Sequence, residues 1–208
     1  MIKAVIFDYG NVISQTQTGD CAEQMEAMTG VPADVFRTVY DRFRFEFDRG
    51  TITGAQMYRQ LLEADGYHQQ AADQQLMEQI ARLDMESWRP VRQDVTDWGL
   101  SLKASGLRLG ILSNMPTEFL ASYEDEIELF KAAHYACFSC RVGLIKPEPA
   151  IYHDVLKGLG VDPQEAVFFD DVAVNVEAAC ALGIHGFVWR GLEQGKRDLQ
   201  QVIAEHGR

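Results

Sequence analysis

The feature that most constrains this chain is an alternation of short apolar runs with longer helix-like stretches. Five runs are four to six residues long and rich in β-branched and aromatic side chains, which is typical of buried strands: 3–7, 107–112, 134–138, 166–169 and 184–189. The stretches between them have helical length: 91–105, 117–130, 149–160 and 172–183. Strands alternating with helices predict right-handed crossovers and a parallel sheet covered on both faces.

One segment near the N-terminus interrupts this alternation. Residues 15–88 contain no strand pattern, and helical patterns occupy most of the segment: 22–28, 33–47, 53–64 and 71–87. An insertion of this length after the first strand would form a small helical bundle of its own. The predicted fold class is therefore α/β, a Rossmann-like doubly wound parallel sheet formed by residues 1–14 and 89–208, with a helical cap domain at 15–88.

Charge and composition narrow the choice of partners. The 208 residues include 19 Lys and Arg against 31 Asp and Glu, a formal charge of −12, which argues against nucleic acid because that binding depends on cationic side chains. No run approaches the roughly 18 apolar residues that a membrane span requires, so no membrane association is expected. Four cysteines are too few for a disulfide scaffold, and we expect a cytoplasmic protein.

Polar residues follow several of the predicted strands. Asp8 comes after the first strand, Ser113 and Asn114 after the second, and Asp170 and Asp171 after the fourth. Lys146 precedes a predicted helix. Each residue alone has an ordinary structural explanation in turns and caps. Together they would converge at the carboxyl edge of the sheet, where open α/β sheets bind ligands.

The carboxylates in this set predict a cation. A cluster of carboxylates is costly unless a cation or a proton offsets its charge. Oxygen ligands suit a hard divalent ion such as Mg²⁺, which takes one or two carboxylates and leaves room for phosphate.

These motifs, in this order, resemble the haloacid dehalogenase-like (HAD) hydrolase superfamily, and the resemblance extends from residue 1 to about residue 189. The four matching segments are Asp8-Tyr9-Gly10-Asn11-Val12, Leu112-Ser113-Asn114, Ile145-Lys146-Pro147-Glu148-Pro149, and Phe169-Asp170-Asp171 with Asn175. The helical insertion falls where this family has its C1 cap. The first segment is also similar to a bacterial Asp-x-Gly-Asn-Val subgroup that includes sugar-phosphate phosphatases.

The resemblance implies a role for each of these residues. Asp8 would be the catalytic nucleophile, forming an aspartyl phosphate that water then hydrolyses. Mg²⁺ would be held by Asp8, Asp171 and the backbone carbonyl of Gly10, with Asp170 acting through a metal-bound water or by orienting Lys146. Substrate oxygens would be held by Ser113 and by backbone amides near Gly10, Asn11 and Asn114, while Lys146 supplies a positive charge. The implied activity is Mg²⁺-dependent hydrolysis of a small phosphorylated metabolite.

One position departs from the family pattern. Most phosphatases of the superfamily have a second Asp two residues after the nucleophile, which protonates the leaving oxygen, but this chain has Gly10. Loss of a positioned acid typically costs about 10²- to 10⁴-fold in rate. Esters at the anomeric carbon of a sugar need the acid less, so a sugar 1-phosphate is a reasonable substrate.

Two alternative functions stay open. The chain would be a binding or regulatory protein if the change at Gly10 had removed catalysis. It would be a carbon–halogen hydrolase if Asp8 worked without metal, but Asp170 and Asp171 would then have no explanation.

The predicted cap contributes aromatic and basic side chains. Phe36, Tyr40, Phe43 and Phe47 are spaced as the buried stripe of one helix. Arg37, Arg42, Arg44 and Arg49 lie on other faces or at its end, and we expect them to be solvated unless cap closure brings one or two to the substrate.

Overall fold

A five-stranded parallel sheet forms the centre of the molecule. The computed structural model describes residues 1–17 and 20–207, so two residues of the predicted cap and the last residue of the predicted core, Arg208, lie outside the described residues. The strands are β1 (Ala4–Phe7), β2 (Arg108–Ser113), β3 (Tyr135–Phe138), β4 (Ala166–Asp170) and β5 (His185–Val188), in the order β3-β2-β1-β4-β5. All five predicted strands are confirmed to within one or two residues at each end.

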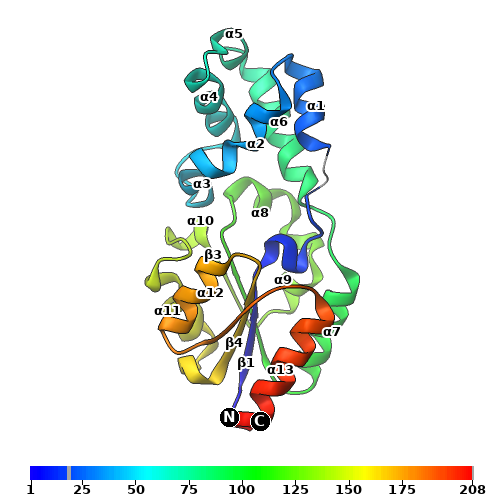
Figure 1. Cartoon of the computed structure of the whole chain (residues 1–208), viewed down its shortest axis with the longest axis vertical. Helices are drawn as coiled ribbons and strands as arrows, with labels where there is room; N and C mark the ends of the chain where they lie inside the picture. The colour runs from blue at the N-terminus through cyan, green and yellow to red at the C-terminus, as the bar shows by residue number, and fades with distance from the viewer. Residues whose placement is uncertain (18–19, 208) are drawn as a thin grey trace.

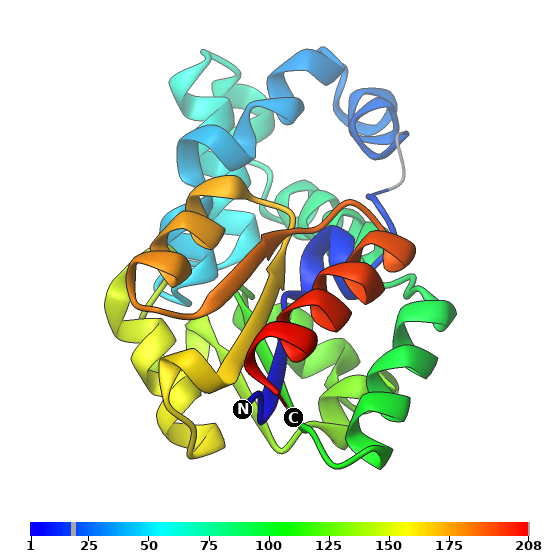
Figure 2. The same ribbon diagram turned by 60° about the horizontal axis from the view of Figure 1, so that its bottom comes forward.

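The alternation of side chains along β1 shows why both faces of the sheet are covered. Ala4 and Ile6 belong to one apolar cluster, while Val5 and Phe7 belong to another. Helices α11 (Pro149–Leu159) and α12 (Ala173–Ala181) lie on the first face, and α7 (Gln93–Ala104) and α13 (Leu192–His206) lie on the second (Figures 1 and 2). The sheet is therefore buried on both sides, as its almost uninterrupted apolar strands require.

Several core helices differ from the predicted ones. The stretch 117–130 was predicted as one helix, which is wrong, because Ile127 has extended backbone angles (φ −89°, ψ 108°) that break it. It is divided into α8 (Thr117–Tyr123), the 3₁₀ turn η2 (Glu124–Glu126) and α9 (Glu128–Ala132). Two helices had no predicted counterpart, α10 (Ser139–Val142) and α13, and a further 3₁₀ turn, η3 (Pro163–Glu165), precedes β4.

The segment between β1 and α7 is helical and lies at one end of the molecule (Figure 1). It contains α1 (Cys21–Thr29), α2 (Ala33–Arg37), α3 (Val39–Asp48), α4 (Gly54–Ala64), α5 (His68–Ala71) and α6 (Gln74–Ser87). Local signals explain some of their ends: Thr53 and Gln56 form a capping box at the start of α4. The predicted single helix 33–47 is two helices, which meet at Thr38. We call residues 20–88 of this segment the cap.

The cap is tied to the core at its base and along one edge. At the base, Ser14 and Val91 form an isolated antiparallel bridge, so the two connecting segments run side by side. Along the edge, the Arg49 guanidinium pairs with Glu148 at 2.7 Å, and the amide of Gly54 donates to Glu118 Oε2 at 2.9 Å. Arg49 was expected to be a solvated charge, but it is half-buried in a contact between cap and core. The structure thus has the cap docked onto the carboxyl edge of the sheet.

None of the helices in the described residues combines the length and the apolar character needed to cross a membrane.

Candidate active site

A single wide helical turn after β1 presents the first predicted motif. This turn, η1, spans Tyr9–Ile13 and contains two residues with non-helical backbone angles, Gly10 (φ −59°, ψ 128°) and Asn11 (φ 56°). The amide of Asp8 donates to the carbonyl of Phe169 at 2.9 Å. Asp8 is therefore fixed beside the end of β4, and the residue is only 6% exposed.

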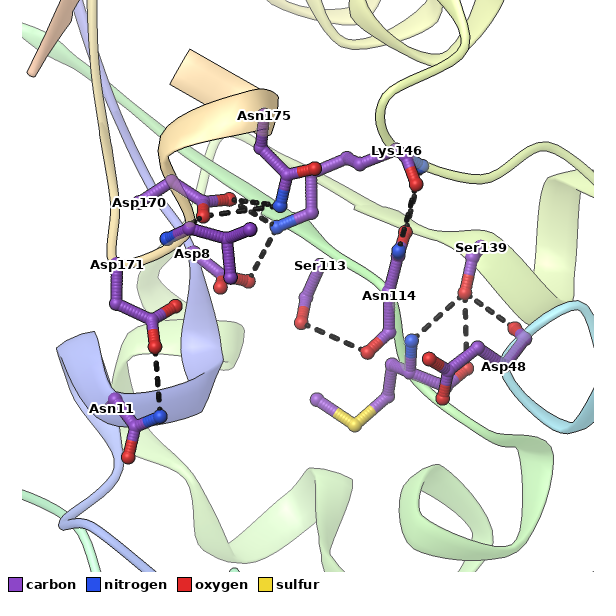
Figure 3. A network of polar contacts seen from close by, with 12 residues as sticks. Asp8, Asn11, Asp48, Ser113, Asn114, Ser139, Lys146, Asp170, Asp171 and Asn175 are labelled. Atoms are coloured by element: carbon purple, nitrogen blue, oxygen red, sulfur yellow. Dashed lines mark hydrogen bonds and ion pairs between the residues drawn. The ribbon is translucent and has the colours of Figure 1, made fainter. Parts of the chain in front are cut away.

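Lys146 lies between two of the carboxylates at the strand ends. Its Nζ is 2.8 Å from Asp8 Oδ1 and 2.6 Å from Asp170 Oδ2, and all three residues are buried (Figure 3). Burial raises the pKa of Asp8 to about 7, against the opposing effect of the Lys146 charge. Burial alone would lower the pKa of Lys146, but the charges of Asp170 and Asp8 outweigh it and raise that pKa above its usual range. The two carboxylates thus favour the charged form of Lys146 in the centre of the site.

The acidic pair after β4 is held in two different ways. Asp170 accepts hydrogen bonds from the amide of Val172 at 2.8 Å and from Asn175 Nδ2 at 3.1 Å, so it is fully engaged within the protein. Asp171 accepts a hydrogen bond from Asn11 Nδ2 at 2.8 Å. Burial raises the pKa of Asp171, although the Asn11 hydrogen bond opposes this shift.

Ser113 and Asn114 have distinct positions at the end of β2. The Asn114 amide side chain donates to the Lys146 carbonyl at 3.1 Å and accepts from the Lys146 amide at 2.8 Å. This pair of bonds holds the backbone of Lys146 against β2, so the Asn114 side chain positions the lysine. Ser113 is buried, and its hydroxyl has only a long contact of 3.5 Å with the Asn114 carbonyl. Its hydroxyl therefore has no strong partner inside the protein among the described residues.

The acidic groups fit a divalent cation. One carboxylate oxygen from each of Asp8, Asp170 and Asp171 lies within 4.8 Å of the other two. The cluster has three carboxylates and one lysine, so it carries an excess of negative charge in a buried place. Hard oxygen donors of this kind suit Mg²⁺.

A cleft of about 370 Å³ lies between these residues and the cap. On the core side it is lined by all the predicted site residues except Asp170, which is fully buried beneath them. On the cap side the lining includes Tyr40, Arg44, Phe45, Phe47, Asp48 and Trp88. This volume is typical of a site for a small molecule.

Sequence reasoning left open whether one or two cap arginines reach the substrate, and it did not predict which cap residues line this cleft. Arg44 was expected to be solvated, but its Nε donates to Asp48 Oδ2 at 2.6 Å and its guanidinium lies 4.4 Å from the centroid of the Tyr40 ring. Tyr40 was expected in a buried stripe, yet it lines the cleft. The helical period of α3 gives no indication of which face meets the core, because that depends on how the cap docks.

A Rossmann-like sheet with clustered carboxylates and a lysine at its strand ends, beneath a helical cap, defines an α/β protein with an acidic active site. Residues 2–183 match the haloacid dehalogenase-like hydrolase family, and the chain belongs to this family. The predicted superfamily and fold class are thereby confirmed.

Similar proteins agree with this assignment. The chain is 26% identical to Putative phosphatase YhcW of Bacillus subtilis (strain 168) over 191 residues, 88% of this chain and 81% of YhcW. Flavin mononucleotide hydrolase 1 of Arabidopsis thaliana is 28% identical over 49% of this chain. In that protein the match covers 41% of its length, and several other curated relatives are matched over an even smaller share.

The fold is also that of solved structures. A HAD family enzyme of Bacteroides thetaiotaomicron has a TM-score of 0.74 at 19% identity, covering 94% of this chain and 98% of that one. The same enzyme in complex with magnesium and inorganic phosphate has a TM-score of 0.69 at 21% identity, covering 90% and 94% of the two chains.

Proposed function

We propose that this hydrolase cleaves small phosphate monoesters with the help of Mg²⁺, and that Asp8 is its nucleophile. The observation that carries this proposal is the arrangement of Asp8, Asp171 and Lys146 on one wall of the cleft between core and cap. A carboxylate beside a buried cation and an acidic cluster is suited to attack an anionic phosphorus centre. The Mg²⁺ and phosphate complex of the Bacteroides relative and the phosphatase name of YhcW support the same chemistry.

Asp8 performs the first step in this proposal. One of its oxygens attacks phosphorus, the bond to the leaving oxygen breaks, and an aspartyl phosphate forms, which water then hydrolyses. Lys146 keeps Asp8 oriented and places positive charge next to the phosphoryl oxygens. The Ser113 hydroxyl and the amides of η1 are available to bind the remaining phosphoryl oxygens.

Asp8, Asp171 and the Gly10 carbonyl would hold Mg²⁺, with Asp170 behind them fixing Lys146. The ion would neutralise the charge of the phosphoryl group as the substrate is attacked.

The cap completes the site by covering the phosphoryl group. Tyr40, Phe45 and Trp88 line the cap side of the cleft, and in this proposal closure of the cap excludes water while the phosphoryl group is transferred. The size of the cleft supports a small phosphorylated metabolite, and a sugar 1-phosphate remains our expected substrate if the leaving oxygen receives no proton from the protein.

The proposal is tested by a screen of aryl phosphates and phosphorylated metabolites with and without Mg²⁺, using the wild type and Asp8→Asn. We expect Mg²⁺-dependent release of phosphate that Asp8→Asn abolishes while the protein keeps its circular dichroism spectrum. Absence of turnover with every ester, an aryl phosphate included, would favour a binding protein. Activity on 2-haloacids in the presence of a chelator would favour the carbon–halogen hydrolase.

A further inference from the structure

We infer that Asp48 of the cap donates the proton to the leaving oxygen and so supplies the acid that Gly10 lacks; this inference rests on the proposed phosphatase function. Asp48 is the last residue of α3, is 2% exposed, and lines the same cleft as Asp8. In Figure 3 it lies on the opposite side of Ser113 and Asn114 from Asp8.

One oxygen of Asp48 is free for this role. Oδ2 accepts the hydrogen bond from Arg44 Nε, but Oδ1 is buried and has no hydrogen-bond partner within residues 1–17 and 20–207. An unpaired buried oxygen costs free energy, so a partner from the substrate would relieve it. A protonated Oδ1 would donate to the leaving oxygen, and the resulting carboxylate would remain paired with Arg44.

The docking of the cap fixes Asp48 relative to the end of β2. Ser139 donates its hydroxyl to the backbone carbonyl of Asp48, and the same hydroxyl accepts from the amide of Met115 at 2.8 Å. Met115 directly follows Ser113 and Asn114, so one buried serine connects Asp48 to the strand that borders the phosphoryl site. The acid is therefore in place only when the cap is docked.

The other protic side chains that line the cleft are engaged or solvated. The Tyr9 hydroxyl donates to the Trp88 carbonyl at 2.8 Å, and the Tyr40 hydroxyl donates to Asp84. Lys146 is held between Asp8 and Asp170, whereas Asp41 is exposed. Among the described residues, Asp48 is the cleft-lining carboxyl group that is buried, unpaired at one oxygen and outside the acidic cluster.

The electrostatic surroundings favour a protonated Asp48. Burial raises the pKa of Asp48, while the charges of Arg44 and Lys146 lower it. The other titratable groups that face it are Cys140 from the core and Asp84 from α6. The balance leaves its pKa above the usual value for Asp, as a general acid requires.

Protons and electron pairs balance over the two proposed steps. When Asp8 attacks phosphorus, the electron pair of the broken bond remains on the leaving oxygen, which takes the proton of Asp48 and departs as an alcohol. The Asp48 carboxylate then takes a proton from the water that attacks the aspartyl phosphate. Asp8 is released as a carboxylate, hydrogen phosphate leaves, and Asp48 is protonated again.

The test measures how kcat/KM depends on the leaving group, in the wild type and in Asp48→Asn. Substituted phenyl phosphates share one shape and differ in leaving-group acidity, and an alkyl phosphate extends the series to a poor leaving group. Because kcat/KM reports the steps up to leaving-group departure, later hydrolysis of the aspartyl phosphate does not affect it. We expect Asp48→Asn to lose about 10²- to 10⁴-fold on the alkyl ester and far less on 4-nitrophenyl phosphate.

A matched control and a rescue separate proton donation from a structural role. Asp65→Asn is the control, because Asp65 pairs with Arg42 of α3 at 2.9 Å as Asp48 pairs with Arg44, but it does not line the cleft. Gly10→Asp should restore alkyl turnover to Asp48→Asn by at least tenfold. Gly10 has a negative φ, and a Cβ there would meet its nearest neighbour, Trp88, at 3.9 Å, so a side chain fits.

A wild-type pH profile tests the inference without a variant that must fold. The kcat/KM for the alkyl ester should fall as the pH rises through the pKa of Asp48, whereas that for 4-nitrophenyl phosphate should not. Two results would overturn the inference and leave the proposed phosphatase function standing. One is an equal loss of kcat/KM on all esters in Asp48→Asn. The other is the same decrease of kcat/KM at alkaline pH for the alkyl ester and for 4-nitrophenyl phosphate. Absence of Asp8-dependent turnover on any ester would overturn the phosphatase and the inference together.

Discussion

Replacement of Lys146 by methionine removes a positive charge from the buried carboxylates while keeping a long apolar side chain. The Nζ atom lies 2.8 Å from Asp8 and 2.6 Å from Asp170. At an effective dielectric constant near 20, each contact corresponds to about 6 kcal/mol before desolvation is subtracted. Removal of one member of such a buried group costs a net of about 3–5 kcal/mol, and we expect Lys146→Met to lower the free energy of unfolding by this amount at pH 8 without Mg²⁺.

The cost should depend on pH. Burial already raises the pKa of Asp8 to about 7, and loss of the Lys146 charge raises that pKa further. Some carboxyl groups have a higher pKa in the folded state than in the unfolded state. Such a group contributes its full stability at a pH below its unfolded pKa. It loses that contribution to the free energy of unfolding as the pH rises through its folded pKa. The difference in stability between the wild type and Lys146→Met should therefore be smaller at pH 5 than at pH 8.

Urea denaturation followed by circular dichroism at pH 5 and pH 8, with EDTA or with Mg²⁺, measures these differences. Mg²⁺ should offset part of the loss because it supplies positive charge to the same carboxylates. Lys157→Met, at an exposed position of α11, is the control and should change stability by less than about 0.5 kcal/mol. A loss for Lys146→Met that is equal at both pH values and insensitive to Mg²⁺ would show that Lys146 acts through packing, and the electrostatic reasoning would be wrong.

Two further perturbations test the metal site and the docked cap. EDTA should abolish ester hydrolysis and Mg²⁺ should restore it, with Asp171→Asn requiring a higher Mg²⁺ concentration for half of full activity; an unchanged requirement would place the ligand elsewhere. The Arg49–Glu148 pair is partly exposed and contributes about 1 kcal/mol or less, so Glu148→Gln should lower kcat/KM by at most about fivefold. A double-mutant cycle with Arg49→Met measures that coupling, and a loss beyond tenfold for Arg49→Met alone would mean that Arg49 contacts the substrate.

Local patterns were sufficient to predict the sheet and the proximity of the polar residues that follow its strands. The strands are short apolar segments whose lengths and punctuation can be read directly, and β1 shows the result: every residue of it is buried, on alternating faces. Because parallel strands place their carboxyl ends at one edge, Asp8, Ser113 and Asp170 had to come close together once the sheet was correct. The number of residues that separate these three positions along the chain does not affect the inference that they lie close together.

Helix limits were less predictable where the tertiary structure overrides local propensity. The helical period continues through Thr38 and through Ile127, yet Thr38 separates α2 from α3 and Ile127 separates η2 from α9. The amphipathic α13 packs Leu199 and Val202 against the second face of the sheet, although the predicted elements ended at the fifth strand.

The chain by itself determined which residues stand at the ends of β1, β2 and β4, because the order of residues and the length of each strand decide which side chain comes directly after it. Only the tertiary structure decided which groups stand opposite them. Asp48 reaches the cleft because its carbonyl is held by Ser139, 91 residues further along the chain, and Lys146 is placed by two hydrogen bonds with Asn114. Contacts of this kind depend on how two packed surfaces dock, and docking combines the shapes and charges of many residues that no local pattern contains.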